Sequence, residues 1–296
     1  MKYQYDLLVI GSGSSGFTAA TSAKGQGRKI GIIEEDRLWG GECPNWACVP
    51  TKAILKSAKV FRDVQDSEQY GVVAKGASID FSAVLSRRNK IVATIGGKRI
   101  EESASKLGID TIKGRATFLD DHTVHVGDKT YTSDKFVIAT GSGTFVPPIQ
   151  GLDKVDWLDF KRIMGLGKLP KSLIVIGGGP VGCEYAFAFA TFGTKVTLLQ
   201  SALRVLNRED VDISQVAHDS LVLSGVAVHV GSEVLSVDQS GEGKVVTVKI
   251  GKDIVKMNAE HIFLATGKRS NTSGMGLKAA GVKLDDRGSV IVNTTL

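Results

Sequence analysis

The sequence has few cysteines, few prolines and no long apolar run, and each shortage excludes a class of protein. Three cysteines among 296 residues cannot build the disulfide framework of a small secreted domain, so a reducing, cytoplasmic environment is expected. Only six prolines argue against a low-complexity or disordered chain. Glu184 and Lys195 interrupt the most apolar stretch, which leaves no segment long enough to span a membrane. We expect a soluble globular protein with no membrane partner.

Long runs of one charge are also missing. The formal net charge is +6, but Lys and Arg are interspersed with Asp and Glu, and no basic block or aromatic RNA-binding motif occurs. Nucleic acid is therefore not expected as a partner, whereas a small anionic ligand suits the positive charge. No set of Cys and His residues has the spacing of a zinc site, so no metal is expected.

Glycine, in contrast, is abundant, with 35 residues, and part of it belongs to an internal repeat. The apolar run Leu7–Ile10 is followed by glycines in the pattern G-x-G-x-x-G, and Leu173–Ile176, 166 residues later, is followed by the same pattern. Each copy continues with a helical stretch that contains alanines and with a second apolar run. Both copies are predicted to fold as strand, turn, helix and strand, with the strands buried in a parallel sheet.

This repeat predicts two dinucleotide-binding turns. The first glycine makes a tight turn, the second lets the backbone approach a pyrophosphate, and the third lets the helix pack on the strand. The N-terminus of the helix then faces the phosphates. The residues expected to bind a cofactor at these turns are Gly11, Gly13, Ser14 and Gly16 in the first copy and Gly177, Gly179, Val181 and Gly182 in the second.

The residue that ends the second strand of each copy distinguishes the two ligands. Glu34 can accept hydrogen bonds from both ribose hydroxyls of FAD or NAD. Gln200 takes the same place in the second copy and does not repel a 2′-phosphate, and Arg204 follows four residues later, where it can bind one. We therefore predict NADP(H) in preference to NAD(H). The alternative is that Gln200 bonds to an unphosphorylated ribose and Arg204 is a solvated loop residue.

Cys43 and Cys48 lie five residues apart, shortly after the first copy, in the segment GGECPNWACVPTK. At the start of a helix, this spacing brings two sulfur atoms close enough for a disulfide if the turn is slightly irregular. A helix N-terminus and a nearby lysine also favour a reactive thiolate. The alternatives are a metal site and two inert buried thiols. Cys183 is expected to be a packed small side chain rather than a third redox thiol.

The cysteine segment resembles the redox motif G-G-x-C-x-N-x-G-C-x-P-[ST]-K of the flavoprotein disulfide reductases, the group that includes dihydrolipoamide dehydrogenase, mercuric reductase and glutathione reductase. The matching residues are Gly40, Gly41, Cys43, Asn45, Cys48, Pro50, Thr51 and Lys52. Ala47 stands where the family usually has glycine. Two Ala-Thr-Gly segments, at 139–141 and 265–267, extend the resemblance over the whole chain.

The resemblance implies an α/β fold with two Rossmann-like dinucleotide-binding domains, the second inserted in the first. The expected domains are residues 1–150 for the first FAD segment, 151–270 for the NAD(P) domain and 271–296 for the start of the returning FAD segment. Family members continue into a C-terminal dimerisation domain. We therefore expect this chain to be a truncated form of a homodimeric enzyme.

The resemblance also implies an activity. Electrons would pass from NAD(P)H through FAD to the Cys43–Cys48 disulfide and on to a disulfide, dithiol or metal-thiol substrate. By the same resemblance, Cys48 forms the charge-transfer thiolate, Cys43 attacks substrate, and Lys52 pairs with Glu184 near the flavin.

The resemblance assigns further cofactor-binding residues, namely Gly41, Thr140, Gly141 and Gly267. A dihydrolipoamide dehydrogenase is expected to prefer NAD and to carry an acid in place of Gln200. Two other functions stay open from the sequence. They are a non-catalytic FAD- or NADP-binding fragment and a diaphorase-type flavin reductase with idle cysteines.

Overall fold

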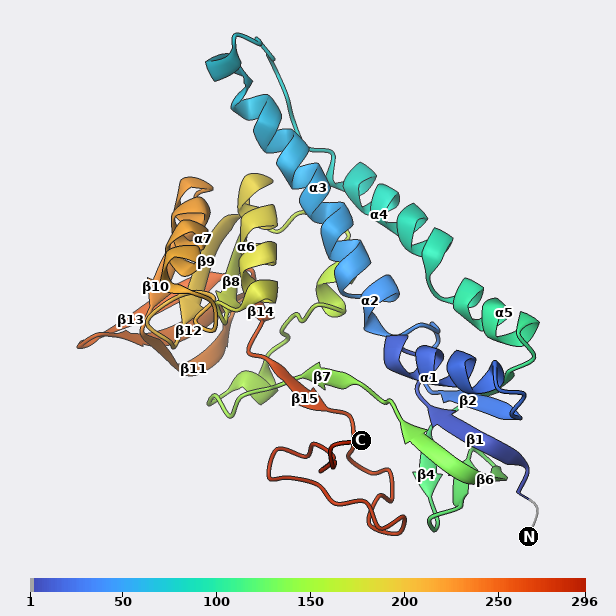
Figure 1. Ribbon diagram of the computed structural model, residues 1–296. Coiled ribbons are helices and arrows are strands. Elements are labelled where there is room, and N and C mark those ends of the chain that lie inside the picture. The colour runs from blue at the N-terminus through green and yellow to red at the C-terminus, as the bar shows by residue number, and fades with distance from the viewer. Residues whose placement is uncertain (1–2) are drawn as a thin grey trace. The chain divides into compact units, whose positions relative to one another are not determined.

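The computed structural model describes residues 3–296, which form two compact units (Figure 1). Of the described residues, the first unit contains 3–50, Lys90–Gly143 and Lys268–Leu296, and the second contains Thr51–Asn89 and Thr144–Gly267. The second unit is thus inserted in the chain of the first, as the fold class predicted. The segment 51–89 groups with the second unit. The domain limits 1–150, 151–270 and 271–296 stay predictions.

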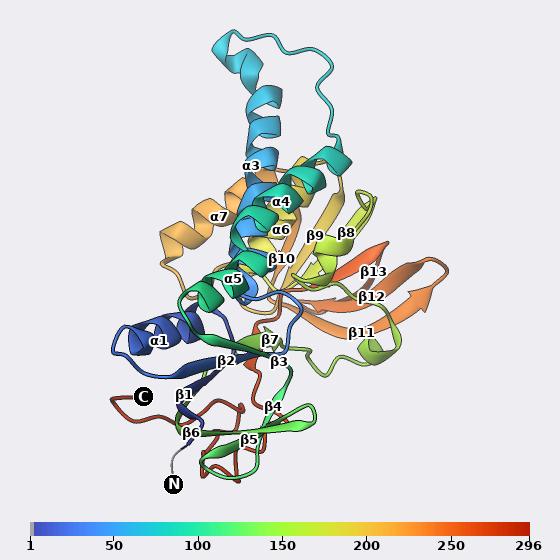
Figure 2. The same cartoon turned by 90° about the vertical axis from the view of Figure 1, so that its right-hand side faces the viewer.

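A six-stranded sheet forms the centre of the first unit. Its strand order is β3 (Asp110–Lys113), β2 (Ile30–Glu34), β1 (Tyr5–Ile10), β6 (Lys129–Ile138), β5 (Thr123–Val126) and β4 (Ala116–Phe118). β1 pairs in parallel with β2 and β6, and β2 pairs in parallel with β3. The strands β4, β5 and β6 form an antiparallel extension. The helix α1 (Ser14–Lys24) packs against β1 and β2 (Figure 2).

The apolar run of β1 is continuous because both faces of the strand are covered. Leu8 and Ile10 pack into one apolar cluster of the first unit, together with Met275. Val9 points to the other face and packs with Ala20 of α1. Leu8 and Val9 are both fully buried. A strand buried on two faces loses the usual alternation of apolar and polar residues, which confirms the parallel-sheet prediction.

The segment between β2 and β3 is helical. Its helices are α2 (Glu42–Asn45), α3 (Cys48–Gln65), the 3-10 helix η1 (Ser67–Tyr70), α4 (Phe81–Ile95) and α5 (Lys98–Lys106). Two further short strands, β7 (Ser142–Thr144) and β15 (Lys268–Ser270), pair with each other.

The second unit contains a four-stranded parallel sheet and a three-stranded antiparallel sheet. The parallel order is β10 (Ala227–Val230), β9 (Lys195–Gln200), β8 (Ser172–Ile176) and β14 (His261–Leu264). The antiparallel strands are β11 (Ser232–Ser240), β12 (Gly243–Ile250) and β13 (Asp253–Ala259). The helices α6 (Pro180–Thr191) and α7 (Val211–Leu223) lie side by side along the parallel sheet (Figure 1). Two 3-10 helices, η2 (Leu152–Lys154) and η3 (Arg162–Gly165), precede β8.

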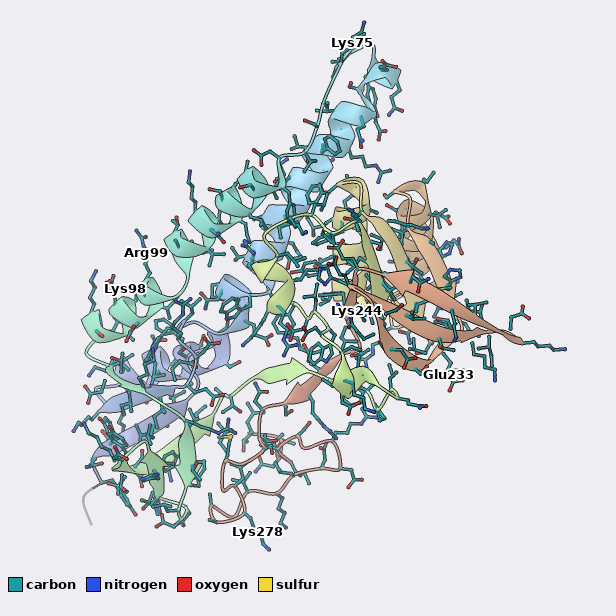
Figure 3. All side chains as sticks on the ribbon, turned by 180° about the vertical axis from the view of Figure 1, so that it is seen from behind. Lys75, Lys98, Arg99, Glu233, Lys244 and Lys278 are labelled. Atoms are coloured by element: carbon teal, nitrogen blue, oxygen red, sulfur yellow. The ribbon has the colours of Figure 1, made fainter. Side chains whose placement is uncertain are left out.

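One apolar cluster joins the two sheets of the second unit. It contains Ile174 and Ile262 from the parallel sheet and Val246 and Val248 from β12. Lys244, also on β12, is almost fully buried and donates a hydrogen bond from its ammonium to the Glu260 carbonyl oxygen at 3.2 Å (Figure 3). The buried charge is thus not left without a partner.

Candidate functional site

The first glycine turn has the backbone geometry that the repeat predicted. Gly11 has φ +105°, and a Cβ atom there would lie 2.3 Å from the Ala139 carbonyl oxygen. At Gly16, a Cβ atom would lie 2.0 Å from the Gly11 carbonyl oxygen. No side chain fits at such distances, so the turn passes directly beside the Ala139-Thr140-Gly141 segment and α1 packs directly on the turn.

The second turn repeats this geometry. Gly177 has φ +110°, and its Cβ would lie 2.3 Å from the Ala265 carbonyl oxygen. The Cβ of Gly182 would lie 1.9 Å from the Gly177 carbonyl oxygen. Ala265 begins the second Ala-Thr-Gly segment, which ends at Gly267. The same contacts therefore build the turn in both units.

The middle glycine of each turn is open on its Cα side. A Cβ at Gly179 would meet nothing within 4 Å, and one at Gly13 would meet only the Gly41 Cα at 3.8 Å. Gly13 and Gly179 are also the N-cap residues of α1 and α6, and neither helix has a side-chain cap. Ser14 and Val181 lie in the first turns of these helices. Open backbone beside an uncapped helix N-terminus fits the phosphates of a dinucleotide in each unit.

Glu34 ends β2 and holds the first turn in place. Its Oε2 accepts hydrogen bonds from the Ser12 backbone N–H at 2.8 Å and from the Ser12 hydroxyl at 2.6 Å, and its Oε1 accepts one from the Asp36 N–H at 2.8 Å. The Ser12 hydroxyl oxygen in turn accepts a hydrogen bond from the Gly40 N–H at 2.9 Å. Ser12 therefore connects the turn, the end of β2 and the start of the cysteine segment. The sequence analysis did not select it.

Gln200 ends β9 in the second unit. Its Oε1 accepts a hydrogen bond from the Gly178 N–H at 3.0 Å, and its Nε2 donates one to the Arg204 carbonyl oxygen at 3.2 Å. The Arg204 side chain donates to the Asn207 carbonyl oxygen at 3.4 Å, whereas its Nη1 is buried without a partner among residues 3–296. The structure thus connects the Gln200 side chain to the Arg204 backbone, and the binding of a 2′-phosphate by Arg204 stays a prediction.

The two cysteines of the redox motif lie on either side of a break between helices. Cys43 lies in α2, and Cys48 is the first residue of α3. The Glu42 carbonyl oxygen accepts hydrogen bonds from both the Trp46 and the Ala47 N–H at 2.7 Å, and this bifurcated turn separates the helices. The segment between the two cysteines is thus an irregular turn. Cys43 is half-buried and Cys48 is exposed, and the disulfide between them stays a prediction.

Asn45 fixes the backbone between the cysteines. Its side-chain amide donates hydrogen bonds to the Trp39 carbonyl oxygen at 2.7 Å and to the Gly41 carbonyl oxygen at 2.8 Å, and its Oδ1 accepts one from the Gly97 N–H at 2.9 Å. Asn45 is 4% exposed. The sequence analysis used Asn45 only to match the motif, and its position between two redox cysteines was the available signal for this role.

Gly41 brings the cysteine segment close to the first turn. It has φ +71°, and a Cβ there would lie 2.8 Å from the Gly13 Cα. In the same unit Glu42 forms an ion pair with Lys268, the residue after Gly267. The Thr140 carbonyl oxygen accepts a hydrogen bond from the Asn271 side chain at 3.0 Å, and the Gly141 carbonyl oxygen accepts one from the Asn271 N–H at 3.0 Å. The predicted flavin-site residues of the first unit thus share one local framework.

Lys52 and Glu184 form an ion pair within the second unit, between α3 and α6. Their side chains are 61% and 30% exposed, and exposed pairs of this kind contribute only about 0–1 kcal/mol to stability. Their role beside a flavin stays a prediction.

Cys183, next to Glu184, is a packed thiol. Burial, with a smaller contribution from Glu184, raises the pKa of Cys183 to about 11. Its Sγ lies 3.4 Å from the Gly178 carbonyl oxygen. These features agree with the expected packed side chain.

Among residues 3–296, the structure has neither a cluster of candidate metal ligands nor a helix able to cross a membrane. No group of three or more His, Cys, Asp and Glu side chains is arranged to hold a metal ion in this range. Within the same range, no helix combines the length and the apolarity needed to cross a bilayer.

Two dinucleotide-binding turns and a paired-cysteine segment joined to the first of them define the class of flavoprotein disulfide reductases. Residues 5–296 match the family model described as pyridine nucleotide-disulphide oxidoreductase. The chain belongs to this family.

Characterised relatives agree with this assignment. The mercuric reductase of Streptomyces lividans is 36% identical over 99% of this chain and 62% of the relative. The dihydrolipoyl dehydrogenase of Bacillus subtilis (strain 168) is 34% identical over 95% of this chain and 62% of the relative. Among solved structures, a Cu(II) complex of the HOCl-induced flavoprotein disulfide reductase RclA from Escherichia coli is similar, with a TM-score of 0.86, 28% identity and coverage of 99% of this chain and 63% of that chain.

The matches cover nearly all of this chain but only part of each relative. The chain spans 53% of the mercuric reductase of Lysinibacillus sphaericus, to which it is 33% identical, and 62% of the two relatives above. It therefore corresponds to about half to two thirds of their length.

Proposed function

We propose that this chain is an FAD-dependent NAD(P)H:disulfide oxidoreductase, in which electrons reach a substrate through Cys43 and Cys48. The observation that carries the proposal is the joining of the cysteine segment to the first nucleotide turn. Ser12 bonds to Gly40, and Gly41 approaches Gly13 too closely for a side chain at Gly41. A cofactor on this turn would share its binding framework with the cysteine segment.

The first unit fits FAD and the second fits NAD(P)H. Glu34 and the uncapped N-terminus of α1 would hold the adenosine and pyrophosphate of FAD, with Gly41, Thr140 and Gly141 nearby in the same framework. When bound, FAD supplies a two-electron acceptor for the hydride of a reduced nicotinamide. In the second unit, Gln200 is uncharged and Arg204 is cationic, so neither side chain repels a 2′-phosphate. This favours NADP(H).

The dithiol form of the cysteine pair supports reduction of a disulfide by thiol exchange. The Cys43 thiolate attacks one substrate sulfur, so that the substrate S–S bond breaks, a mixed disulfide forms and one substrate thiolate leaves. The Cys48 thiolate then attacks the Cys43 sulfur and releases the second substrate thiolate. The substrate gains two electrons and, from solvent, two protons, and Cys43 and Cys48 become a disulfide. A metal ion held by two thiolates is the second substrate class that this pair can accept.

Titration with NADPH in the absence of oxygen tests the proposal. The flavin-loaded chain and the Cys43→Ser and Cys48→Ser variants would be reduced, and free thiols would then be counted under denaturing conditions. We expect two more thiols in the reduced wild-type chain than in the oxidised one, and no increase in either variant. Flavin reduction with no new thiols in the wild type would identify a diaphorase-type reductase. Binding of both nucleotides with no reduction would identify a non-catalytic module.

A further inference from the structure

Two neighbouring contacts join α3 and α6 in the second unit. Lys52 pairs with Glu184, and the preceding residue, Thr51, shares a hydrogen bond with the residue after Glu184, Tyr185. The two hydroxyl oxygens lie 3.0 Å apart. The exposed ion pair thus lies next to a buried hydrogen bond between the same two helices.

The ion pair and the hydrogen bond differ in how well they fix the positions of their side chains. The Lys52 side chain is mostly exposed, and water and salt weaken such a pair while the long side chains keep their rotamer freedom. Thr51 and Tyr185 are 5% and 1% exposed. A buried hydrogen bond keeps its geometry, because breaking it leaves two hydroxyls without partners and without access to water.

The Tyr185 ring is held from several sides. It lies 4.8 Å from the Phe263 ring and 6.3 Å from the Phe189 ring, measured between centroids. Burial raises the pKa of Tyr185, so its hydroxyl stays protonated. The hydroxyl also lies 3.8 Å from the Met164 sulfur.

Arg88 closes this buried cluster from α4. Its side chain is 6% exposed, and its Nη1 donates a hydrogen bond to the Met164 carbonyl oxygen at 2.7 Å. Burial lowers the pKa of the Arg88 guanidinium, and the electrostatic influence of Tyr185 partly opposes this shift. Thr51, Arg88, Met164 and Tyr185, here called the Tyr185 cluster, therefore bring together α3, α4, η3 and α6.

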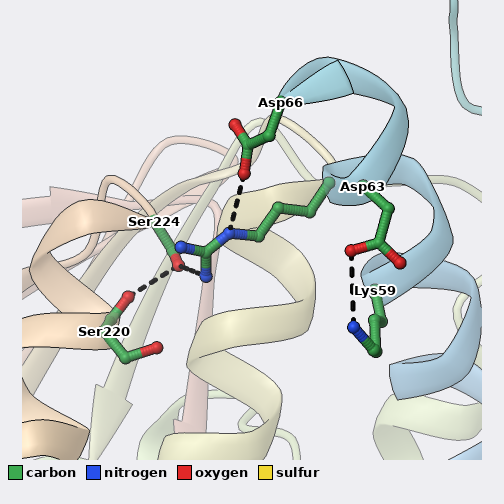
Figure 4. A network of polar contacts seen from close by, with 6 residues as sticks. Lys59, Asp63, Asp66, Ser220 and Ser224 are labelled. Carbon is green, nitrogen blue, oxygen red and sulfur yellow. Dashed lines mark hydrogen bonds and ion pairs between the residues drawn. The ribbon is translucent and has the colours of Figure 1, made fainter. Parts of the chain in front are cut away.

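The far end of α3 has a separate anchor. Arg62 pairs with Asp66 at 3.5 Å and donates a hydrogen bond to the Ser224 hydroxyl, after the end of α7, at 3.1 Å. The Ser224 hydroxyl donates onward to the Ser220 carbonyl oxygen at 2.7 Å (Figure 4). This anchor ties α3 to the same unit without touching the Tyr185 cluster, and it offers a matched control.

We propose that Tyr185 is a positioning residue, which fixes the place of the Lys52 ammonium by holding Thr51 with its buried hydroxyl. Lys52 on its flexible stem cannot select one position through an exposed ion pair. The hydrogen bond between Tyr185 and Thr51 fixes α3 against α6 at the residues adjacent to Glu184 and Lys52. It therefore keeps the Glu184 carboxylate within reach of the Lys52 ammonium. The consequence for electron transfer rests on the proposed function, whereas the positioning itself does not.

Acetylation of lysine amines tests this proposal on the 296-residue chain, without flavin or nicotinamide. The acetylation rate of Lys52 would be measured by peptide mass spectrometry with N-hydroxysuccinimide acetate, relative to Lys56 on the same helix. The Glu184→Gln variant gives the reference acetylation rate of a Lys52 side chain that has lost its ion-pair partner. We expect Tyr185→Phe and Thr51→Val each to raise the Lys52 rate about threefold, toward the Glu184→Gln rate, because the amine leaves its pair. Thr51→Ser keeps the hydroxyl and should keep the wild-type rate.

The control is Ser224→Ala, which removes a hydrogen bond at the other end of α3 and should leave the Lys52 rate unchanged. A wild-type rate in both Tyr185→Phe and Thr51→Val, measured beside a raised rate in Glu184→Gln, would overturn the proposal. An equal rise in Ser224→Ala would also overturn it, because the effect would then be a general loosening of α3. Thr51→Val tests the same bond if Tyr185→Phe does not fold. Loss of thiol reduction by NADPH would refute the proposed function and leave these rates unaffected.

Discussion

Gln200 holds the second glycine turn in the same way as Glu34 holds the first. The Glu34 Oε2 accepts a hydrogen bond from the Ser12 N–H at 2.8 Å, and the Gln200 Oε1 accepts one from the Gly178 N–H at 3.0 Å. Ser12 and Gly178 each follow the first glycine of their turn. The residue that ends the second strand therefore supports the glycine turn in both units. An amide oxygen can replace a carboxylate oxygen in this contact. The residue at this position can therefore be neutral or negatively charged without losing the hydrogen bond to the turn.

The Gln200→Glu substitution should change the nicotinamide preference. A carboxylate oxygen can still accept the Gly178 hydrogen bond, but it cannot replace the Nε2 donor to the Arg204 carbonyl oxygen, so the free energy of unfolding should fall by about 1–3 kcal/mol. The added negative charge opposes the 2′-phosphate of NADPH, and we expect the dissociation constant of NADPH to rise at least about tenfold, which corresponds to about 1.4 kcal/mol. The value for NADH should change less than about threefold. Titration of each nucleotide by calorimetry measures both constants.

The control for this change is Gln239→Glu, which adds the same charge at an exposed position of β11. It should leave the ratio of the two constants unchanged. An unaltered ratio in Gln200→Glu would show that Gln200 does not face the 2′ position.

Alanine substitutions at two glycines of the second turn should have different effects. One should mainly lower stability, and the other should mainly lower nucleotide affinity. An alanine at 182 would place its Cβ 1.9 Å from the Gly177 carbonyl oxygen, and we expect a loss of about 4 kcal/mol or more in the free energy of unfolding. An alanine at 179 meets nothing within 4 Å and should cost about 1 kcal/mol or less, as at an N-cap. Its methyl group nevertheless occupies the approach of the pyrophosphate, so NADPH affinity should fall at least about tenfold.

Chemical denaturation and NADPH titration of both variants check this pair. Normal NADPH binding by Gly179→Ala would place the pyrophosphate away from this turn. A stable Gly182→Ala chain would contradict the close packing of α6 on the turn.

The parts of the fold that depend on local backbone chemistry were predictable from the sequence. A doubly covered strand needs the continuous apolar run of Leu7–Ile10, and close passage of a strand and a helix needs glycine at positions 11 and 16. Both patterns occur a second time in the sequence, 166 residues later. For Cys43 and Cys48, the spacing allowed a close approach of the sulfur atoms only on the condition of an irregular turn, and it did not itself predict that turn.

Contacts between distant segments were not predictable in the same way. The Ser12 hydroxyl reaches Gly40, and Asn45 reaches Gly97, and neither partner is indicated by a local pattern. The grouping of Thr51–Asn89 with the second unit depends on buried contacts such as Thr51–Tyr185. A single sequence contains these residues but not their pairing, because many serines, asparagines and threonines could satisfy the same hydrogen bonds.

The Asn45→Asp substitution should destabilise the first unit. The Asn45 amide is the hydrogen-bond donor to the Trp39 and Gly41 carbonyl oxygens, and a buried carboxylate of the same shape would face both oxygens without a proton to donate. We expect a loss of about 3 kcal/mol in the free energy of unfolding at neutral pH. Urea denaturation followed by circular dichroism measures it.

Asn89→Asp is the matched control for this change, because Asn89 is exposed, and its effect should stay within about 0.5 kcal/mol. Because a protonated aspartic acid can donate one hydrogen bond, the deficit of Asn45→Asp should shrink as the pH falls toward 5. Equal stabilities of the two variants at neutral pH would contradict the role assigned to the Asn45 amide.

In the fully reduced chain, the thiols should differ in their reaction with iodoacetamide. The pKa of Cys183 is raised to about 11, mainly by burial, and only the thiolate reacts. At pH 8 its thiolate fraction is then about 10⁻³, at least about 100-fold below that of a free cysteine in solution. We expect Cys183 to react about 100-fold more slowly than the exposed Cys48, with a rate that rises about tenfold per pH unit up to about pH 11. Peptide mass spectrometry after timed quenching measures each rate.

The Cys183→Ser variant provides the control, because it removes the slow phase and should leave the Cys48 rate unchanged. Guanidinium should abolish the difference between Cys183 and Cys48, since unfolding returns a buried thiol to water and lowers its pKa toward the ordinary value. If Cys183 in the folded chain reacted as fast as Cys48 at pH 8, the thiol would not be packed against the Gly178 carbonyl. It would then have to be considered as a third redox group beside Glu184.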